Sequence, residues 1–256
     1  MKKIFYQLKN KLFKNAFKYY DAKRATYFMN QVKNEPWAKT LRVCQQEIIQ
    51  ADPSSPYAKM YAAEEALYWL KIPQWIYADN CKKPITKYLD IGCAYGTLAL
   101  FTKKISNCDL YCIDVHSYYL NKMLIDRYGI QFKTCNIEKD QFPWNTKFDA
   151  IIFTEVLEHL NFHPLSTLKK LGNLINDSGA IYLSTPDSKF WGRVTKYYSH
   201  YEDMPHSEDL EDALFIDDHI YQYSLDFTFR PPPLNFSLNL VDLVILAFLD
   251  GEYFYK

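Results

Sequence analysis

Short apolar segments alternate with helical patterns between residues 87 and 184, and this alternation limits the possible folds strongly. Strands are expected at residues 87–91, 109–113, 131–135, 150–153 and 180–184, and helices at 97–104, 118–128 and 165–175. Strands that alternate with helices form a mostly parallel sheet with helices on both faces. The rules for chain connections then favour a Rossmann-like, doubly wound α/β sandwich.

The sequence ahead of this region reads mainly as helices. A break with two prolines at residues 52–56 precedes a helical pattern over 57–70, for which Ser55 is a candidate N-terminal cap. The sequence therefore predicts an N-terminal helical extension over residues 1–82 and a main domain over 83–256.

The first twenty residues form a basic amphipathic pattern, with apolar residues at helical spacing, six lysines and no acidic residue before Asp21. Such a helix either packs its apolar stripe on its own domain or lies on an anionic membrane surface. The apolar run at residues 240–249 is interrupted by Asp242 and is too short to span a bilayer. The sequence therefore predicts no transmembrane segment and leaves peripheral membrane contact through the N-terminal helix open.

Cysteine usage and charge narrow the class of protein further. The six cysteines form no CxxC pair, which favours buried, reduced thiols over disulfides or a zinc site. The 30 basic and 30 acidic side chains give a formal net charge of zero, and this balance argues against a general nucleic-acid binder. No signal-peptide pattern is present at the N-terminus, so a cytoplasmic protein is expected.

The first strand of the alternating region runs into a glycine turn. Residues 88–96 read Tyr-Leu-Asp-Ile-Gly-Cys-Ala-Tyr-Gly, in which Gly92 and Gly96 let the backbone turn sharply and approach a ligand closely. Asp114 ends the second strand, where a carboxylate can accept hydrogen bonds from two ribose hydroxyls. Because ligands of such sheets bind beyond the carboxyl ends of the strands, the sequence predicts a nucleoside site at this turn.

Two residues distinguish between the nucleoside ligands that this turn can receive. The dinucleotide pattern requires a third glycine where this chain has Thr97. Asp90 would repel a pyrophosphate, but it would attract a ligand that carries an ammonium and a sulfonium group. The charge therefore favours S-adenosylmethionine and disfavours the cofactor of an NAD-dependent oxidoreductase.

Residues 85–225 resemble the class I S-adenosylmethionine-dependent methyltransferases, whose first motif is acid-x-Gly-x-Gly-x-Gly. Asp90, Gly92 and Gly96 match the motif, and Ala94 replaces its middle glycine. The resemblance implies that residues 90–96 cradle the methionine portion of the cofactor. The further cofactor-binding residues that it implies are Cys93 in the turn, Asp114 at the ribose with its neighbour Val115, Asn136 and Ile137 near the adenine, and Glu155 after the fourth strand.

The fourth strand leads into Thr-Glu-Val-Leu-Glu-His-Leu at residues 154–160. This segment resembles the quinone-biosynthesis O-methyltransferases of the same family, and Glu155, Glu158 and His159 match the Glu-x-x-Glu-His that carries a metal there and in small-RNA 2′-O-methyltransferases. On a helical turn, residues three and four apart share a face, so these side chains are candidate Mg²⁺ ligands. His159 is alternatively a general base or a packing residue. His219 is the candidate for the later histidine of the RNA enzymes, and it is the second candidate catalytic residue.

The resemblance ends near residue 226, and the chain is atypical beyond it. The family has a helix, a glycine turn and two final strands there, whereas this sequence has three prolines at 231–233, which exclude a central strand. One helix and one strand are therefore expected to be missing or replaced. The segment 184–206 is either an acceptor-binding lid or an ordinary connection.

The sequence thus predicts an S-adenosylmethionine-dependent methyltransferase that O-methylates a small molecule or a glycan. A hydroxyl acceptor must lose its proton, either to a histidine or with the help of a metal such as Mg²⁺. The alternatives are the NAD-dependent oxidoreductase and a non-catalytic protein that keeps the fold and the cofactor. An RNA acceptor is disfavoured by the neutral charge.

Overall fold

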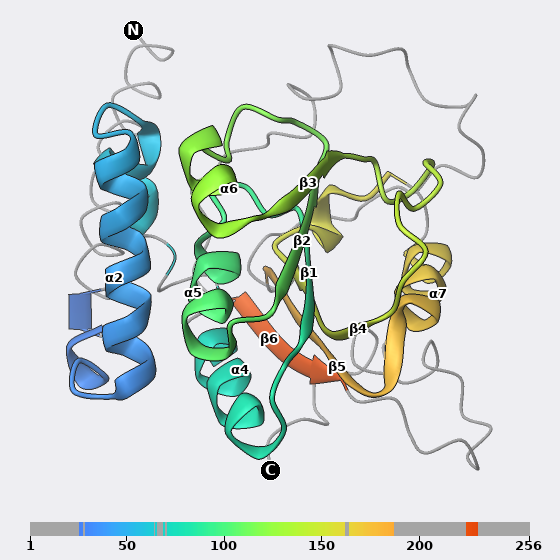
Figure 1. The fold of residues 1–256 in the computed structure, drawn as a ribbon, viewed down its shortest axis with the longest axis horizontal. Helices are drawn as coiled ribbons and strands as arrows, with labels where there is room; N and C mark the ends of the chain where they lie inside the picture. The colour runs from blue at the N-terminus through green and yellow to red at the C-terminus, as the bar shows by residue number, and fades with distance from the viewer. Residues whose placement is uncertain are drawn as a thin grey trace, which may run out of the picture.

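The computed structural model describes residues 26–27, 29–63, 65, 69, 71–161, 164–186 and 224–229. These residues contain a six-stranded sheet with the order β3-β2-β1-β4-β5-β6 (Figure 1). The parallel strands are β1 (Lys87–Ile91), β2 (Asp109–Asp114), β3 (Gln131–Thr134), β4 (Phe148–Thr154) and β5 (Ile175–Pro186). At the edge of the described sheet, β6 (Ser224–Phe229) pairs antiparallel with β5. The predicted Rossmann-like, mostly parallel sheet is confirmed.

The strand order reverses beside β1. The chain passes from β1 to β2 and β3 on one side, and then returns to β4 and β5 on the other. At such a switch point the connections that follow the two central strands diverge and leave a crevice at the carboxyl ends of the strands. The glycine turn after β1 and the segment after β4 both lie at this crevice.

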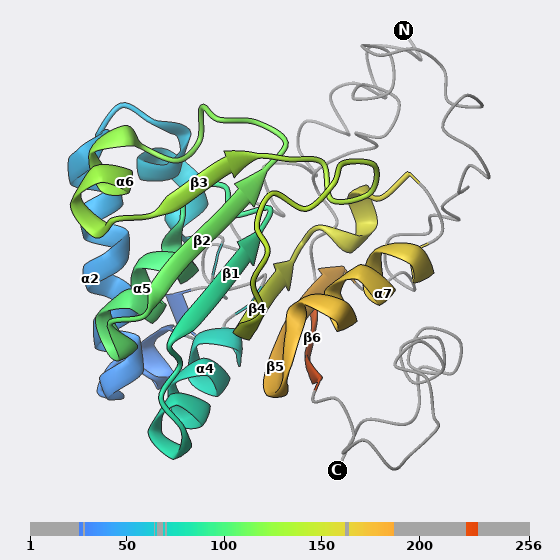
Figure 2. The same cartoon turned by 45° about the vertical axis from the view of Figure 1, so that its right-hand side comes forward.

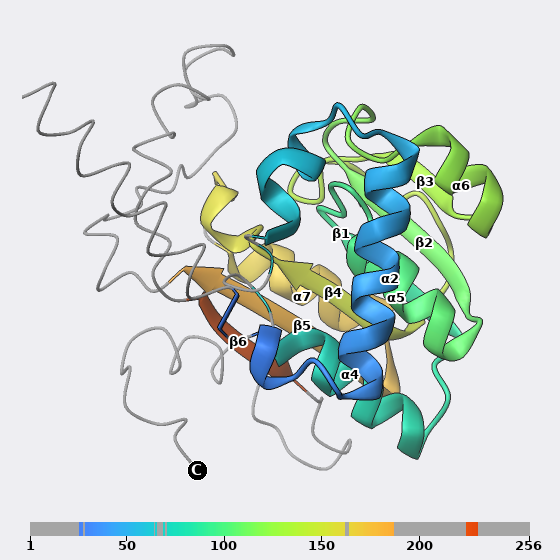
Figure 3. The same ribbon diagram turned by 90° about the vertical axis from the view of Figure 1, so that its left-hand side faces the viewer.

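Helices cover both faces of the sheet (Figures 1 and 2). One face carries α4 (Lys71–Lys82), α5 (Thr97–Ser106) and α6 (Lys122–Tyr128), and the other carries α7 (Leu165–Leu174). α2 (Pro36–Ala51) packs against α5 and forms a second helical layer outside it (Figure 3). Two short elements complete the described part, the π-helix η1 (Tyr57–Tyr61) and the 3₁₀ helix η2 (Leu157–His159).

Alternate residues of the strands point into two hydrophobic clusters, as the pleat of a sheet requires. Tyr88 and Ile152 belong to the cluster beneath α5, whereas their neighbours Leu89 and Ile151 belong to the cluster beneath α7. Buried residues from the helices before β1 belong to the first cluster, among them Trp37, Leu41 and Ile72. The helices of the predicted extension therefore share a core with the sheet, and the boundary near residue 82 stays a prediction.

Two predicted element boundaries are wrong, the start of α6 and the start of β5. α6 begins at Lys122 and not at residue 118, because the Asn121 side chain caps the helix by accepting a hydrogen bond of 2.9 Å from the Met123 N–H. On the other side of the sheet, α7 ends at Leu174 and β5 begins directly at Ile175, so the strand includes the Asp-Ser-Gly residues for which a turn was expected.

β6 was not predicted from the sequence, although Leu225, Phe227 and Phe229 alternate with polar residues as in a strand. Its edge position agrees with the three prolines that follow it, because proline is excluded only from central strands. The predicted basic helix, the greater part of the predicted lid and the C-terminal apolar run lie outside the described residues. None of the described helices is long and apolar enough to cross a membrane.

Candidate cofactor site

The glycine turn after β1 is held by its two neighbouring strands. The Gly92 N–H donates a hydrogen bond of 2.9 Å to the Ile113 carbonyl of β2. Gly92 has a φ of +73°, and a Cβ atom at this position would lie 2.4 Å from Cγ2 of Val156, which follows β4. Glycine is therefore required here both for its backbone conformation and for the close approach of the segment after β4.

Ala94 replaces the middle glycine of the motif and adopts a left-handed conformation with a φ of 43°. A non-glycine residue in this region carries a steric cost of about 1–2 kcal/mol. The turn tolerates the cost because the Ala94 N–H donates a hydrogen bond of 2.9 Å to Asp114 Oδ2 at the end of β2. The turn thus keeps the geometry of the glycine motif with an alanine at its centre.

Asp90, the penultimate residue of β1, is a buried carboxyl that is only 3% exposed. Burial raises the pKa of Asp90 to about 7, and the negative charge of Asp114 adds to this effect, while a hydrogen bond from the Tyr88 hydroxyl to Asp90 Oδ2 (3.2 Å) opposes it. A carboxyl that ionises near neutrality in a buried position is suited to a cationic ligand, since a positive charge would favour its ionised form.

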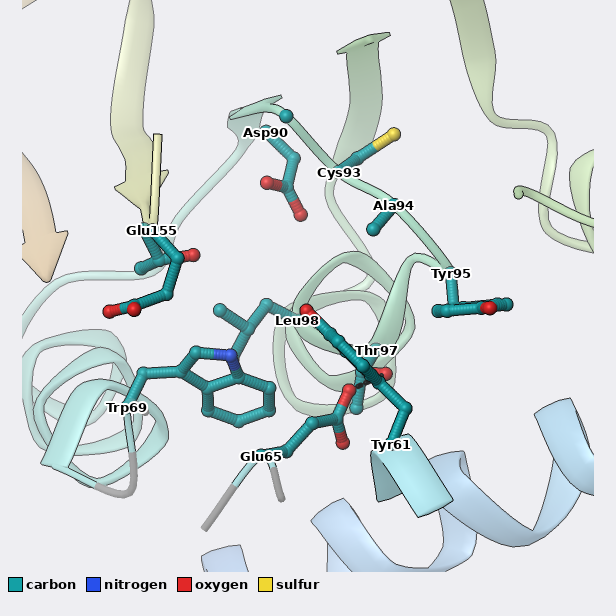
Figure 4. A pocket seen from close by; sticks show the side chains of 12 residues that line it. Tyr61, Glu65, Trp69, Asp90, Cys93, Ala94, Tyr95, Thr97, Leu98 and Glu155 are labelled. Atoms are coloured by element: carbon teal, nitrogen blue, oxygen red, sulfur yellow. Dashed lines mark hydrogen bonds between the residues drawn. The ribbon is translucent and has the colours of Figure 1, made fainter. Parts of the chain in front are cut away.

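A pocket with an open volume of about 360 Å³, which includes solvent at its mouth, lies against this turn. On the sheet side it presents Asp90 and Glu155, and on the helical side Tyr61, Glu65 and Trp69 (Figure 4). Three of the described lining residues are acidic, and none is lysine, arginine or histidine. The ionised forms of Asp90 and Glu155 would attract a cation and repel a phosphate.

The predicted cofactor residues fall into two groups. Those that line the pocket are Asp90, Gly92, Cys93, Ala94 and Glu155. The second group lies outside the pocket lining and comprises Gly96, Asp114, Val115, Asn136 and Ile137. Gly96 directly precedes α5 and has a φ of +79°. In the same group, Val115 is 52% exposed, whereas Ile137 is buried in the cluster beneath α7. The nucleoside contacts of the second group stay predictions.

Asp114 has a structural role in addition to the predicted one. Its Oδ2 accepts the hydrogen bond from the Ala94 N–H, and its Oδ1 accepts one of 3.1 Å from the His116 N–H. A carboxylate has about four lone-pair sites, so two sites are left for hydroxyl donors. The same side chain can therefore fix the turn and hold a ribose.

The segment after β4 differs from the predicted helical turn. Glu155 has a φ of 53° and lies ahead of η2, which comprises only residues 157–159. Glu155 Oε1 accepts a hydrogen bond of 2.8 Å from the Ser184 hydroxyl of β5, and His159 is exposed at the end of η2. The expectation that Glu155 and His159 share a helical face was wrong, because the left-handed residue turns the chain before the helix begins.

Among the described side chains, no group of three histidine, cysteine, aspartate or glutamate residues has the geometry to hold a metal ion. The Glu158 side chain and His219 lie outside the described part of the chain. The Mg²⁺ site at Glu155, Glu158 and His159 therefore stays a prediction.

The helical side of the pocket was not predicted from the sequence. Tyr61, Glu65 and Trp69 line it and are spaced four residues apart, which is the spacing of one helical face. A signal was present in the sequence, since Glu65 lies on the same face as these aromatic residues. This spacing is not informative by itself, because no feature of the neighbouring sequence indicates that this helical face contacts the glycine turn. Thr97, Leu98, Tyr95 and Thr154, which also line the pocket, are neighbours of predicted residues.

The fold and the pocket define a class, a Rossmann-like protein with an acidic pocket at the switch point of its sheet. Residues 34–226 match the family described as "Methyltransferase domain", and this match covers well over half of the 256 residues. The chain belongs to this family, and its sheet has the Rossmann-like fold of the class I methyltransferases. Its closer relation to the quinone-biosynthesis enzymes stays a prediction.

Comparison with solved structures gives further similar proteins. The N-methyltransferase NodS from Bradyrhizobium japonicum WM9 is 20% identical, with a TM-score of 0.43 over 62% of this chain and 93% of NodS. An S-adenosylmethionine-dependent methyltransferase from Clostridium acetobutylicum ATCC 824 is 15% identical, with a TM-score of 0.44 over 53% of this chain and 60% of that protein. The N-terminal domain of EvdMO1 with SAH bound is 18% identical, with a TM-score of 0.41 over 56% of this chain and 64% of that domain.

The chain spans less than two thirds of the length of several of these structures, for example 49% of the N-terminal domain of EvdMO1 in the presence of SAH and D-fucose. No curated protein matches the sequence.

The described residues fit the cofactor that the family implies. S-adenosylmethionine carries a sulfonium and an ammonium, and the pocket offers buried carboxyl groups without a competing cation among its described lining residues. The left-handed turn at Gly92 and Ala94 brings the backbone to the pocket wall, where a ligand can approach it closely.

Proposed function

We propose that this methyltransferase transfers a methyl group from S-adenosylmethionine to a hydroxyl group of a small molecule or a glycan. The observation that carries the proposal is the position of His159, exposed at the end of η2, while Glu155 of the same segment lines the pocket. An acceptor that approaches from solvent meets the histidine beside the strand end that borders the cofactor.

The chain's own residues have distinct roles in this proposal. Asp90 and the turn hold the methionine portion, Asp114 holds the ribose, and Asn136 and Ile137 lie beside the adenine. When bound, S-adenosylmethionine supplies a methyl group on a sulfonium, and an acceptor oxygen takes it up in an in-line displacement. The protein contributes mainly alignment and the exclusion of water.

His159 removes the proton of the acceptor hydroxyl. A histidine imidazole can act as a general base in this step, and such a base contributes about 10²–10⁴-fold to a rate. The proton passes to a ring nitrogen of His159 as the oxygen–methyl bond forms, while the electron pair of the broken sulfur–methyl bond stays on sulfur. Atoms and charge therefore balance without a further reactant.

The proposal assigns no step to Mg²⁺. The helical face that would bring Glu155, Glu158 and His159 together does not form at Glu155, whose Oε1 accepts a hydrogen bond from Ser184. The initial rate should therefore stay within about twofold when EDTA is added.

Two other functions were considered from the sequence. The family match assigns the chain to the methyltransferases and not to the nicotinamide-dependent oxidoreductases. A non-catalytic protein that binds the cofactor stays the alternative, and product formation separates it from the proposal.

The test is methyl transfer from S-adenosylmethionine with a labelled methyl group to a panel of phenols, catechols and glycans, with amines as a separate set. Label in a hydroxyl-bearing acceptor, with equal formation of S-adenosylhomocysteine, is the expected result. Label only in amines would contradict O-methylation. Tight cofactor binding without transfer to any acceptor would favour the non-catalytic alternative.

A further inference from the structure

Glu65 is a buried carboxyl in the wall of the cofactor pocket, and it has no role in the proposed methyl transfer. It is 2% exposed and lies between helical segments before β1 and the first residue of α5. Its Oε1 is 2.6 Å from the Thr97 hydroxyl oxygen, and its Oε2 is 2.9 Å from the Tyr57 hydroxyl oxygen. The Tyr57 and Thr97 hydroxyl oxygens are in turn 2.9 Å apart. Three oxygen–oxygen contacts thus form a closed ring.

The number of protons in this ring determines the charge of Glu65. Each of the three contacts needs one proton between its oxygens, and the Tyr57 and Thr97 hydroxyls supply only two. The Gln45 amide cannot supply the third, because its two hydrogens serve Glu65 Oε2 and the Ala62 carbonyl, both at 2.8 Å. With an ionised Glu65, one contact would bring two lone pairs together. With a protonated Glu65, every contact is a hydrogen bond.

The surroundings of Glu65 also favour the neutral form. Burial raises the pKa of Glu65 to about 7, although the hydrogen bonds from Gln45, Thr97 and Tyr57 lower it. The titratable groups that face it are the Cys44 thiol of α2, the Tyr57 phenol, and Asp90 and Glu155 across the pocket. Burial raises the pKa of Cys44 to about 12 and also that of Tyr57, so neither carries a charge at neutral pH. No described cation lines the pocket to stabilise a second carboxylate.

We propose that Glu65 acts as a neutral carboxylic acid and is a positioning residue for the cofactor pocket. Its ring with Tyr57 and Thr97 is a proton-dependent latch that holds Tyr61 and Trp69 over the turn after β1. The proposal rests on this pocket being the cofactor site.

The latch weakens as the pH rises. A carboxyl whose pKa is raised in the folded protein contributes its stabilisation in full at low pH and loses it as the pH rises through the folded value, which is about 7 for Glu65. Loss of the proton removes one hydrogen bond of the ring and leaves a buried charge beside the pocket. Tyr61 and Trp69 are then held less firmly, and the ligand loses their contacts.

The Glu65→Gln variant tests whether Glu65 acts as a neutral acid, as proposed, or as an ionised carboxylate. The glutamine amide offers one donor and one acceptor to the same two hydroxyls at every pH, so it mimics the protonated acid. The probe is S-adenosylhomocysteine, which lacks the sulfonium charge, and its affinity is measured by calorimetry for the wild type and the variant at each pH. Asp90 is common to both proteins, so the ratio of their affinities isolates Glu65.

At pH 6 the two proteins should bind equally, and at pH 8.5 the variant should bind roughly three- to tenfold more tightly than the wild type. Glu47→Gln is the matched control, because Glu47 is on α2 but pairs with Lys104 at 2.8 Å. The ratio of the S-adenosylhomocysteine affinity of Glu47→Gln to that of the wild type should not change with pH. Binding by Glu65→Gln that is at least tenfold weaker at pH 6 would show that the carboxylate is required and would overturn the proposal.

A measurement on the ligand-free protein separates the latch from the cofactor assignment. Infrared difference spectra should show the carbonyl bands of two protonated carboxyls at pH 6 that disappear at pH 8.5, and Glu65→Gln should lose one of the two and keep that of Asp90. If Glu65→Gln does not fold, Asp90→Asn removes the other buried carboxyl that titrates near neutrality, and the remaining band reports Glu65. If the Glu65 band is absent at pH 6, the proposed latch is wrong. The band without any binding of S-adenosylhomocysteine would instead contradict the cofactor site.

Discussion

The two ends of the site are built in different ways. At the cofactor end, the turn after β1 is fixed through its backbone, by Ile113 and Asp114 of β2 and by the close approach of Val156. At the acceptor end, Glu155 is hydrogen-bonded to Ser184 of β5 through both its N–H and its Oε1, but His159 is exposed at the end of η2. The cofactor end is therefore formed before any ligand binds, whereas the chemistry of the acceptor end depends on a single exposed side chain. Substitutions at the cofactor end should therefore change mainly the cofactor Kd, and substitutions at the acceptor end mainly kcat.

The largest effect is expected at the acceptor end. His159→Ala removes the proposed base and should lower kcat for a hydroxyl acceptor by about 100-fold or more, with the cofactor Kd unchanged. Steady-state kinetics and calorimetry measure the two quantities. An unchanged kcat would remove His159 from the proposed mechanism.

The next effect is expected at the cofactor end. Asp114→Ala removes the acceptor of the Ala94 and His116 N–H groups as well as the ribose contact, so S-adenosylmethionine should bind at least about tenfold more weakly. Asp109→Ala, at the exposed start of β2, is the matched control and should bind as the wild type does. Equal affinities of the two variants would contradict the cofactor assignment.

The charge of the pocket gives a third, pH-dependent prediction. Because the pKa of Asp90 is about 7, the carboxylate that attracts the cationic cofactor is present above this pH and is lost as the pH falls. The affinity of the wild type relative to Asp90→Asn should therefore rise by about tenfold between pH 6 and pH 8. A ratio that is the same at both pH values would show that the ionised form of Asp90 does not contribute.

The smallest effect concerns the stability of the turn. Ala94→Gly relieves a left-handed alanine and should raise the free energy of unfolding by about 1 kcal/mol, seen as a higher Tm. Ala99→Gly in the middle of α5 is the matched control and should lower it by a similar amount. A lower Tm for Ala94→Gly would show that the turn is not strained.

The turn after β1 could be predicted from the sequence because backbone constraints leave local signals. Gly92 and Gly96 mark positive φ values, and Asp90 lies in the strand pattern itself. The helical turn at Glu155 was not predictable, since its left-handed conformation depends on Ser184, about thirty residues later in the chain. Glu65 was missed for the same reason, because only the folded chain brings it to Thr97.

The central claim is that the turn between β1 and α5 receives a positively charged nucleoside. Calorimetric titration of the wild-type protein with S-adenosylmethionine, with S-adenosylhomocysteine and with NAD tests it most directly. The account predicts saturable binding of the first two and none of NAD. Binding of NAD alone, or no heat with either sulfur compound, would contradict it.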